Sequence, residues 1–316
     1  MMQVLARNKS IGFGVITIVV LSILAVSLPV HRVELITRIL IMALFATSIN
    51  IQLGYGGMMP LGQAMFLGIG GYSFGLLLLK GGLPLTLAFF AGLLLSAVAS
   101  GIIGFFCLRG DSMTFALLHL AFNILLATLA NKWISLTGGS QGFIGIPRPS
   151  MFSSPLGFYF FVLVVVLICY VLIRMIVSSP FGKVTEGLRE NEERICFLGI
   201  DNKKFQLVIF IISGLFTAVA GILWTMLQRG GFPTYMSLIL SAEGLMMCLI
   251  GGMLSFLGPS LGATIVTIMS TVTSSYFQEW QGLLGIIIIG CVLGFRGGIL
   301  GGRKIKIKLS PAGSDK

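Results

Sequence analysis

Few side chains in this sequence could do chemistry, and those that could lie scattered through long apolar stretches. Glu243 is the one carboxylate well inside such a stretch, and the amides Asn50, Gln63 and Asn123 lie in others. A polar group among apolar residues can bind the polar part of a small molecule or an ion. It can also form an ordinary hydrogen bond between two helices, which is the simpler explanation for Asn123. The sequence therefore predicts a path for a solute, lined by Asn50, Gln63, Asn123 and Glu243.

The residue types used for catalysis or metal binding form no recognisable pattern here. The five cysteines have no metal-ligand spacing, and His31 and His119 each stand alone. No phosphate-binding loop is present, since Gly182-Lys183 lacks the upstream glycine that this motif requires. We therefore expect no catalytic site, no metal site and no cofactor in this chain, and no ATP hydrolysis by the chain alone.

The composition places these groups in a membrane protein. Of 316 residues, 56% are hydrophobic and only 10% are charged, and the mean hydropathy is +1.02. Soluble domains have about 25% charged residues. A cytosolic globular enzyme, a disordered chain and a nucleic-acid-binding protein are therefore excluded. The expected fold class is an all-α polytopic membrane protein, with residues 1–316 forming a single transmembrane domain.

Ten stretches are long and apolar enough to cross a membrane, which takes about 20 residues each. We place them at 11–30, 34–53, 61–79, 84–107, 113–131, 156–177, 205–228, 237–256, 260–277 and 283–301. An even number of spans puts both termini on one side. With that side in the cytoplasm, 15 of the 21 Lys and Arg residues lie inside, as the positive-inside rule requires. The net charge of +11 is then mainly a signal of orientation.

Glycines mark both tight helix contacts and interruptions. Two pairs and one series of glycines have the four-residue spacing of close helix–helix contacts. They are Gly71 with Gly75, Gly258 with Gly262, and Gly290, Gly294, Gly298 and Gly302. The segments 54–62 and 251–259 combine several glycines with a proline and cannot continue as straight helices. Irregular backbone at membrane depth persists only inside protein or beside water, so these segments are either breaks that flank the path or simple cytoplasmic turns.

Two connections between the predicted spans are long. Residues 132–155 would form an extracytoplasmic loop, and residues 178–204 would form a cytoplasmic loop. Within the second loop, apolar residues recur near helical spacing at Val184, Leu188, Ile195 and Leu198. The opposite face carries Glu186, Arg189, Glu190, Glu192 and Glu193. A helix resting on anionic lipid prefers Lys and Arg on its polar face. The mixed charges therefore favour one or two short amphipathic helices that dock a cytoplasmic protein.

Four blocks of the sequence, in the correct order, resemble the M-type permease subunits of branched-chain amino-acid ABC importers. They are Gly54–Tyr72, Ser135–Pro147, Ser179–Ile200 and Glu243–Ala263. The resemblance extends over residues 41–302. Some positions depart from the usual pattern of the family. They include Gln63, where many members have His, together with Ile124, Leu254 and Phe295. The departures bear on the substrate more than on the fold.

The resemblance implies an ABC importer permease architecture and a bacterial cytoplasmic (inner) membrane location. It implies a second permease subunit in a heterodimer, two ATPase subunits that bind ATP-Mg, an extracytoplasmic substrate-binding protein and surrounding membrane lipid as partners, with no nucleic acid. The ATPase subunits would dock on Glu186, Arg189, Glu190, Asn191, Glu193 and Gly199. The binding protein would dock on Gly138, Gly139, Gln141, Gly142 and Pro147. The chain itself would be a transport subunit and not an enzyme.

Two other functions fit the same sequence. One is an ion-coupled secondary carrier with Glu243 as its ion site, although such carriers usually display several buried acids or an acid–base pair. The other is an ABC permease for a sugar, a nucleoside or a short-chain amide. Dependence of transport on ATP and partner subunits, or on an ion gradient, separates the first alternative from the importer.

Overall fold

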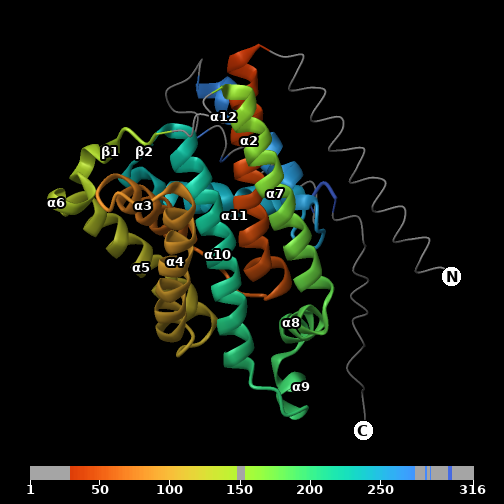
Figure 1. Ribbon diagram of the computed structural model, residues 1–316. Helices are drawn as coiled ribbons and strands as arrows, with labels where there is room; N and C mark the ends of the chain where they lie inside the picture. The colour runs from red at the N-terminus through yellow and green to blue at the C-terminus, as the bar shows by residue number, and fades with distance from the viewer. Residues whose placement is uncertain (1–28, 148–153, 275–281, 283–284, 286–297, 301–316) are drawn as a thin grey trace, which may run out of the picture.

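The computed structural model describes residues 29–147, 154–274, 282, 285 and 298–300. Over these residues the protein is almost entirely α-helical, and its helices form an elongated bundle (Figure 1). The short helices α8 (Pro180–Glu190) and α9 (Glu192–Phe197) lie at one end. Toward the other end, strand β1 (Phe143–Ile144) pairs antiparallel with β2 (Gly230–Gly231). The loops predicted at 178–204 and 132–155 therefore lie at opposite ends of the bundle.

Among the described residues, five helices are long and apolar enough to cross a membrane. They are α2 (Val30–Asn50) with its π-helical continuation η1 (Ile51–Tyr55), α4 (Leu85–Cys107), α5 (Ser112–Lys132), α7 (Pro155–Ser178) and α10 (Asn202–Gln228). Each coincides with one of the predicted spans. The all-α membrane class is thereby confirmed.

Two predicted spans are shorter as helices than expected. Helix α3 (Ala64–Leu79) has 16 residues and α11 (Leu238–Gly251) has 14. At about 1.5 Å per residue they measure about 24 and 21 Å, less than the hydrocarbon core of about 30 Å. The predicted spans 61–79 and 237–256 are therefore part helix and part irregular chain, because glycine-rich segments lie next to both helices.

The remaining elements are short or lie at the edge of the described region. Helix α12 (Gly258–Ser274) occupies the described part of the predicted span 260–277. The described residues also include the short turns α6 (Ile134–Thr137), η2 (Gly139–Gln141) and η4 (Pro233–Met236). The predicted spans 11–30 and 283–301 lie outside the described residues except for a few positions, as do the predicted positions of both termini.

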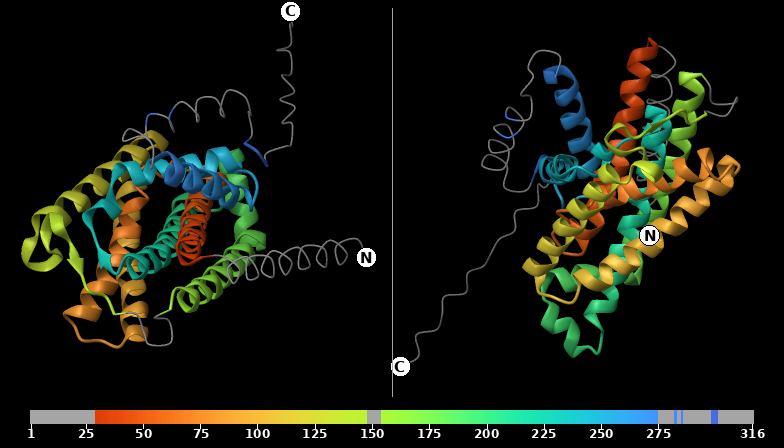
Figure 2. Two further views of the ribbon diagram at one scale, coloured as in Figure 1. Left: turned by 90° about the horizontal axis from the view of Figure 1, so that it is seen from above. Right: turned by 90° about the vertical axis from the view of Figure 1, so that its left-hand side faces the viewer.

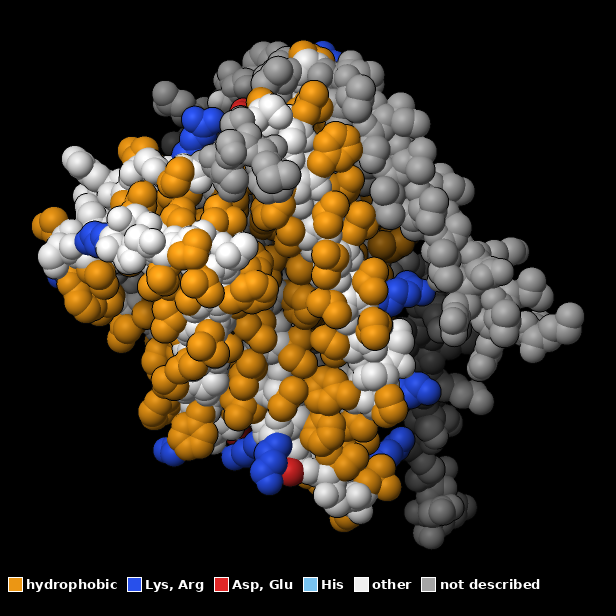
Figure 3. Space-filling view, viewed as in Figure 1, with side chains coloured by type: hydrophobic (Ala, Val, Ile, Leu, Met, Phe, Trp, Pro, Cys, Tyr) orange, Lys and Arg blue, Asp and Glu red, His pale blue; other side chains and the backbone are white. Residues whose placement is uncertain are grey.

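Helices α2 and α10 form the centre of the bundle. About two-thirds of each hydrophobic window is buried, 67% in both, whereas α4, α5 and α7 bury only 28–33% of theirs. The outward faces of these three helices carry large apolar side chains such as Phe90, Leu117 and Val171. Figure 3 shows this apolar surface, with Lys and Arg side chains gathered near the end that carries α8 and α9. A wide apolar belt with charges at its edge is the surface of a membrane protein.

Glycines bring the central helices into backbone contact. A Cβ atom added at Gly221 of α10 would overlap the carbonyl oxygen of Leu67 in α3, and one at Gly70 would lie 2.5 Å from the carbonyl oxygen of Ala218. The predicted small-residue contact at Gly262 is of the same kind, against the Met247 carbonyl, whereas a Cβ at Gly71 would meet the Thr225 side chain first. Such close contact maximises dispersion attraction where no hydrophobic effect drives helices together.

We expect Gly221→Ala to destabilise the protein by about 1–3 kcal/mol, because the added methyl group must push α3 away from α10. The measurement is thermal or denaturant unfolding of the purified protein in detergent. Gly101→Ala in α4 is the matched control, since its Cβ would meet only Ile211 at 3.8 Å. Equal stability of the two variants would show that the α3–α10 contact is not tight.

Candidate functional site

The end of α2 departs from regular helix at the first glycine-rich segment. After Asn50 the chain continues as the π-helix Ile51–Tyr55, and the Met58 amide donates to the Gln52 carbonyl at 3.0 Å. Gly57, at φ 66°, then turns the chain back toward the start of α3. π-helical turns inside α-helices concentrate at functional sites. The predicted interruption at 54–62 is therefore an ordered turn, with five of its nine residues buried and Gly57 and Met59 exposed.

A buried polar cluster ties this interruption to α10. Gln52 Nε2 donates to Gln63 Oε1 at 2.9 Å, and Gln63 Nε2 donates to Ser213 Oγ and Thr217 Oγ1, both at 2.8 Å. Ser48 completes it, with its Oγ 2.8 Å from Thr217 Oγ1 and its carbonyl accepting from Ser213 Oγ at 2.6 Å. All five side chains are fully buried. We call these residues (Ser48, Gln52, Gln63, Ser213 and Thr217) the polar cluster.

The start of α3 lies against the start of α11. The Ala64 amide, the first of α3, donates to Ser241 Oγ at 3.0 Å. Ser241 is in the first turn of α11, whose N-cap is Ser237. Each half-length helix therefore begins inside the bundle next to the other. One free amide at each of these helix N-termini therefore donates to a serine side chain.

The four residues predicted to line the path do not come together as one site. Gln63 and Asn50 lie at the α2–α3 interruption, and both are buried by protein. Asn123 Nδ2 donates to the Met236 carbonyl at 3.1 Å, which ties α5 to η4 as expected of an interhelical hydrogen bond. Glu243 lies on α11 and is only half-buried. In this conformation Gln63 is enclosed by its partners and would have to exchange them to meet a solute.

The loop at 178–204 forms two helices, the larger number expected. Ser179 Oγ caps α8, and Asn191 Oδ1 accepts from the Arg194 amide at 2.9 Å to cap α9. Leu188 is buried, whereas Leu198, predicted on the same packed face, is 70% exposed. The break between the helices at Asn191 changes the direction of the chain, so one helical face cannot extend through both.

The predicted coupling residues divide into exposed ones and a single inward one. The exposed ones are Glu186, Glu190, Asn191, Glu193 and Gly199. Arg189 turns inward, where its Nη1 donates to the Gly54 carbonyl. A Cβ at Gly57 would lie 2.8 Å from Arg189 Cγ, so this glycine makes room for the arginine. Arg189 therefore connects α8 directly to the interrupted end of α2.

Sequence reasoning missed the apolar tip of α9. Phe197 is 89% exposed and lies beside the exposed Leu198. Exposed large apolar residues at a charged end of the molecule indicate a protein contact. The available signal was that Phe197 and Leu198 are adjacent. Neighbouring residues on a helix point in different directions, so one packed face cannot bury both.

The predicted outer docking residues form a tight, glycine-dependent turn. Gly138, Gly139 and Gly142 adopt φ values of 81°, 64° and 67°, which only glycine adopts readily. Gln141 and Pro147 are exposed at its surface. Pairing of β1 with β2 holds the turn against the chain that follows α10. Lys80 Nζ also donates to the carbonyls of residues 135 and 136, at 2.6 and 2.9 Å.

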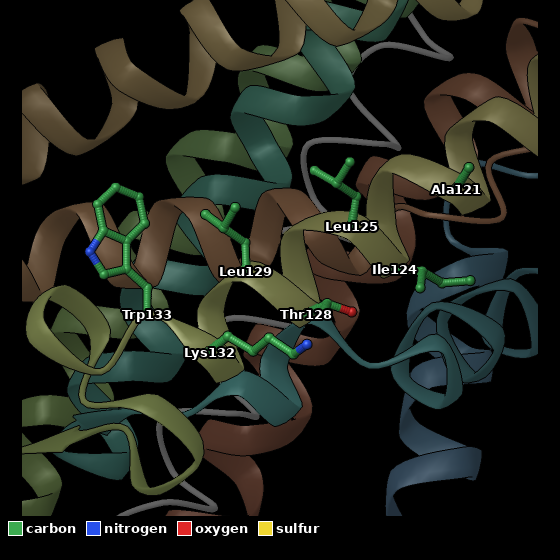
Figure 4. Close-up of a pocket in the computed structure, with 7 residues that line it drawn as sticks. All are labelled: Ala121, Ile124, Leu125, Thr128, Leu129, Lys132 and Trp133. Atoms are coloured by element: carbon green, nitrogen blue, oxygen red, sulfur yellow. The ribbon is translucent and has the colours of Figure 1, made fainter.

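A shallow groove of about 840 Å³ lies on the outward face of α5 (Figure 4). It is lined by Ala121, Ile124, Leu125, Thr128, Leu129, Lys132 and Trp133. The lining is almost wholly apolar, and its Trp and Lys lie at the helix end, as membrane-interface anchors do. None of the four predicted path residues lines it.

These observations define a class: an α-helical membrane protein with two half-length helices that meet inside the bundle. Residues 32–293 match the family described as branched-chain amino acid transport system / permease component. The chain belongs to this family. The match includes both interruptions, the outer turn and the α8–α9 pair.

The most informative relatives are permease proteins named LivM. The high-affinity branched-chain amino acid transport system permease protein LivM of Escherichia coli is 26% identical over 92% of this chain and 76% of its own length. A probable LivM of Methanocaldococcus jannaschii is 24% identical over 76% of this chain and 80% of its own length. No solved structure matches this chain.

Gln63→Leu should lower the stability of the protein by about 1–3 kcal/mol, because it leaves Gln52, Ser213 and Thr217 with fewer buried partners. The unfolding midpoint of the purified protein measures this change. Ser96→Ala is the control, since the buried Ser96 Oγ has no hydrogen-bond partner among the described residues. A Gln63→Leu protein as stable as wild type would mean that the polar cluster contributes nothing.

Proposed function

We propose that this chain is the membrane-spanning permease subunit of an ATP-driven importer of branched-chain or related hydrophobic amino acids. The observation that carries the proposal is the contact of Arg189 with the Gly54 carbonyl. Through this contact, α8 at the charged end of the molecule binds the interrupted end of α2 directly. An importer powered from outside its membrane domain needs such a contact, and a carrier driven by its own bound ion does not.

The proposal assigns partners to the two ends of the bundle. Two ATPase subunits bind ATP-Mg and dock on α8 and α9 of this chain and of a second permease subunit. A substrate-binding protein delivers the amino acid to the turn at Gly138–Gly142. The complex lies in the bacterial inner membrane, with ten spans and both termini in the cytoplasm. This chain contributes no catalytic group and no cofactor to ATP hydrolysis.

The test of the proposal is transport of labelled leucine into proteoliposomes that hold the assembled complex. Uptake should require ATP, both ATPase subunits and loaded binding protein. Uptake by this chain alone, driven by a proton or sodium gradient, would show instead an ion-coupled carrier. A ligand screen of the binding protein separates amino acids from sugars, nucleosides and amides.

Phe197→Ser should weaken assembly with the ATPase subunits about tenfold or more, because truncation of a central apolar anchor is costly at protein interfaces. Co-purification of the ATPase subunits at decreasing concentration measures this loss. Ile144→Ser is the matched control, since Ile144 is 73% exposed at the other end of the bundle. Unchanged assembly of the Phe197→Ser complex would remove α9 from the interface.

Arg189→Met should leave assembly intact but reduce the amino acid moved per ATP hydrolysed. The reduction should be about fivefold or more, since a hydrogen bond from a charged donor contributes about 1.5–3 kcal/mol. ATP hydrolysis and uptake are measured in the same proteoliposomes. Arg194→Met, at an exposed position in α9, is the control. Wild-type coupling in the Arg189→Met complex would show that the contact with Gly54 carries no force.

A further inference from the structure

One arginine contacts a tryptophan on a second helix and interacts electrostatically with a glutamate on a third. Arg38 comes from α2, Trp224 from α10 and Glu243 from α11. The Arg38 guanidinium carbon lies 5.3 Å from the centroid of the Trp224 ring, a cation–π arrangement. Arg38 lies two turns inside α2, at a depth where an arginine is costly unless it has a function or a partner.

Arg38 and Glu243 attract each other but do not form a direct salt bridge. Each is the charged group that acts electrostatically on the other. Among the residues that the structure describes, the ion pair found is Lys204 with Asp201, far from this site. Arg38 Nε is also buried with no hydrogen-bond partner in the described part of the chain. The two charges therefore interact without direct contact, and the arginine has unused donor capacity.

Glu243 lies at the border between the packed face and the exposed face of α11. One face of α11 is packed inside the bundle, with Gly244, Met247 and Cys248 buried. The exposed face carries Ile239, 51% exposed, and Leu249, 40% exposed, and Glu243 lies at its edge. Lipid is a poor neighbour for a carboxylate at the edge of an apolar face. A face that is apolar apart from one charge suits a small molecule with one ammonium group and an apolar remainder.

We propose that Arg38 and Glu243 form a binding site for the charged head of an α-amino acid on its way through the membrane. Arg38 binds the α-carboxylate, Glu243 binds the α-ammonium group, and the apolar face of α11 receives the side chain. The assignment rests on the proposed function, because it supposes that amino acids pass through this chain.

The chemistry selects a zwitterion over the other solutes. A proton or sodium ion at Glu243 would be repelled by Arg38, and a sugar or nucleoside would leave both charges unpaired, which is costly away from water. A zwitterion pairs with both charges at once and adds no net charge. Trp224 helps to hold the guanidinium in place from the side that the amino acid does not occupy.

The test compares the double variant Arg38→Gln/Glu243→Gln with wild type in the assembled complex. The control is Arg32→Gln/Glu34→Gln, which removes the same two charges from exposed positions of α2. With saturating loaded binding protein, leucine uptake by the first variant should fall about tenfold or more, since each charged hydrogen bond lost costs about 1.5–3 kcal/mol. Assembly, basal ATP hydrolysis and docking of the binding protein should remain as in wild type, and the control should transport normally.

Three results would overturn the proposal. The first is uptake by the double variant within twofold of wild type, which would make the charges a structural pair that neutral amides replace. The second is a pair of results: the double variant fails to assemble, and Arg38→Lys/Glu243→Asp takes up leucine as wild type does. The two charges would then be needed for folding, and their reach toward a ligand would not matter. The third is that wild-type uptake requires an ion gradient and that Glu243→Gln abolishes this uptake. Failure of wild type to transport any amino acid with ATP would instead refute the proposed function.

Discussion

A helix that stops among buried residues leaves carbonyl and amide groups that water cannot reach, and the end of α2, the start of α3 and the end of α11 are such places. Each freed group costs several kcal/mol unless the protein supplies a partner. The Gly54 carbonyl accepts from Arg189, the Gln52 carbonyl accepts from Met58, and the Ala64 amide donates to Ser241. These partners come from α8, from the interruption itself and from α11. The need to satisfy the broken backbone thus holds distant parts of the chain together.

The same requirement explains where the glycines are. At Gly54 a side chain would collide with the carbonyl of residue 253, so the two glycine-rich segments touch through bare backbone. Gly298 packs in the same manner against Gly252, and the amides of residues 299 and 300 donate to the carbonyls of Ile250 and Gly251. Hence the end of α11 also finds backbone partners. Glycine serves two purposes, tight seams between continuous helices and close contact between interrupted ones.

Sequence patterns predict the parts of this structure that are local. Long apolar windows locate α2, α4, α5, α7 and α10 because burial in lipid depends on composition alone. The amphipathic pattern of 180–201 predicts α8 and α9 because helical periodicity is also a local property of the sequence. Hydropathy cannot show that α3 and α11 are too short to cross the membrane, because the irregular residues beside them are apolar too. The glycines beside these helices indicate that the helices are interrupted, but they do not give the helix lengths.

The functional contacts were less predictable because they join residues distant in sequence. Arg189 was assigned to an exposed face from its helical position, but its direction depends on the bend of the chain at Gly57. Arg38 lies inside the predicted span 34–53, which was a usable signal, yet its nearness to Glu243 depends on how α11 crosses α2. Phe197 could be recognised as a candidate contact residue only from its exposure in the structure. Tertiary arrangement, and not residue type, decided each case.

The polar cluster is neutral throughout, and this bears on how the bundle can move. Buried hydrogen bonds between uncharged side chains in membranes contribute about 0.6 kcal/mol each on average. Gln63 can therefore exchange Ser213 and Thr217 for other hydroxyl or amide partners at little cost. A cluster built from ion pairs would resist such exchange, because separating buried charges costs far more. Arg38 and Glu243, which we propose bind a charged solute, are not part of this neutral cluster. Arg189 likewise donates to a neutral group, the Gly54 carbonyl, and not to a carboxylate.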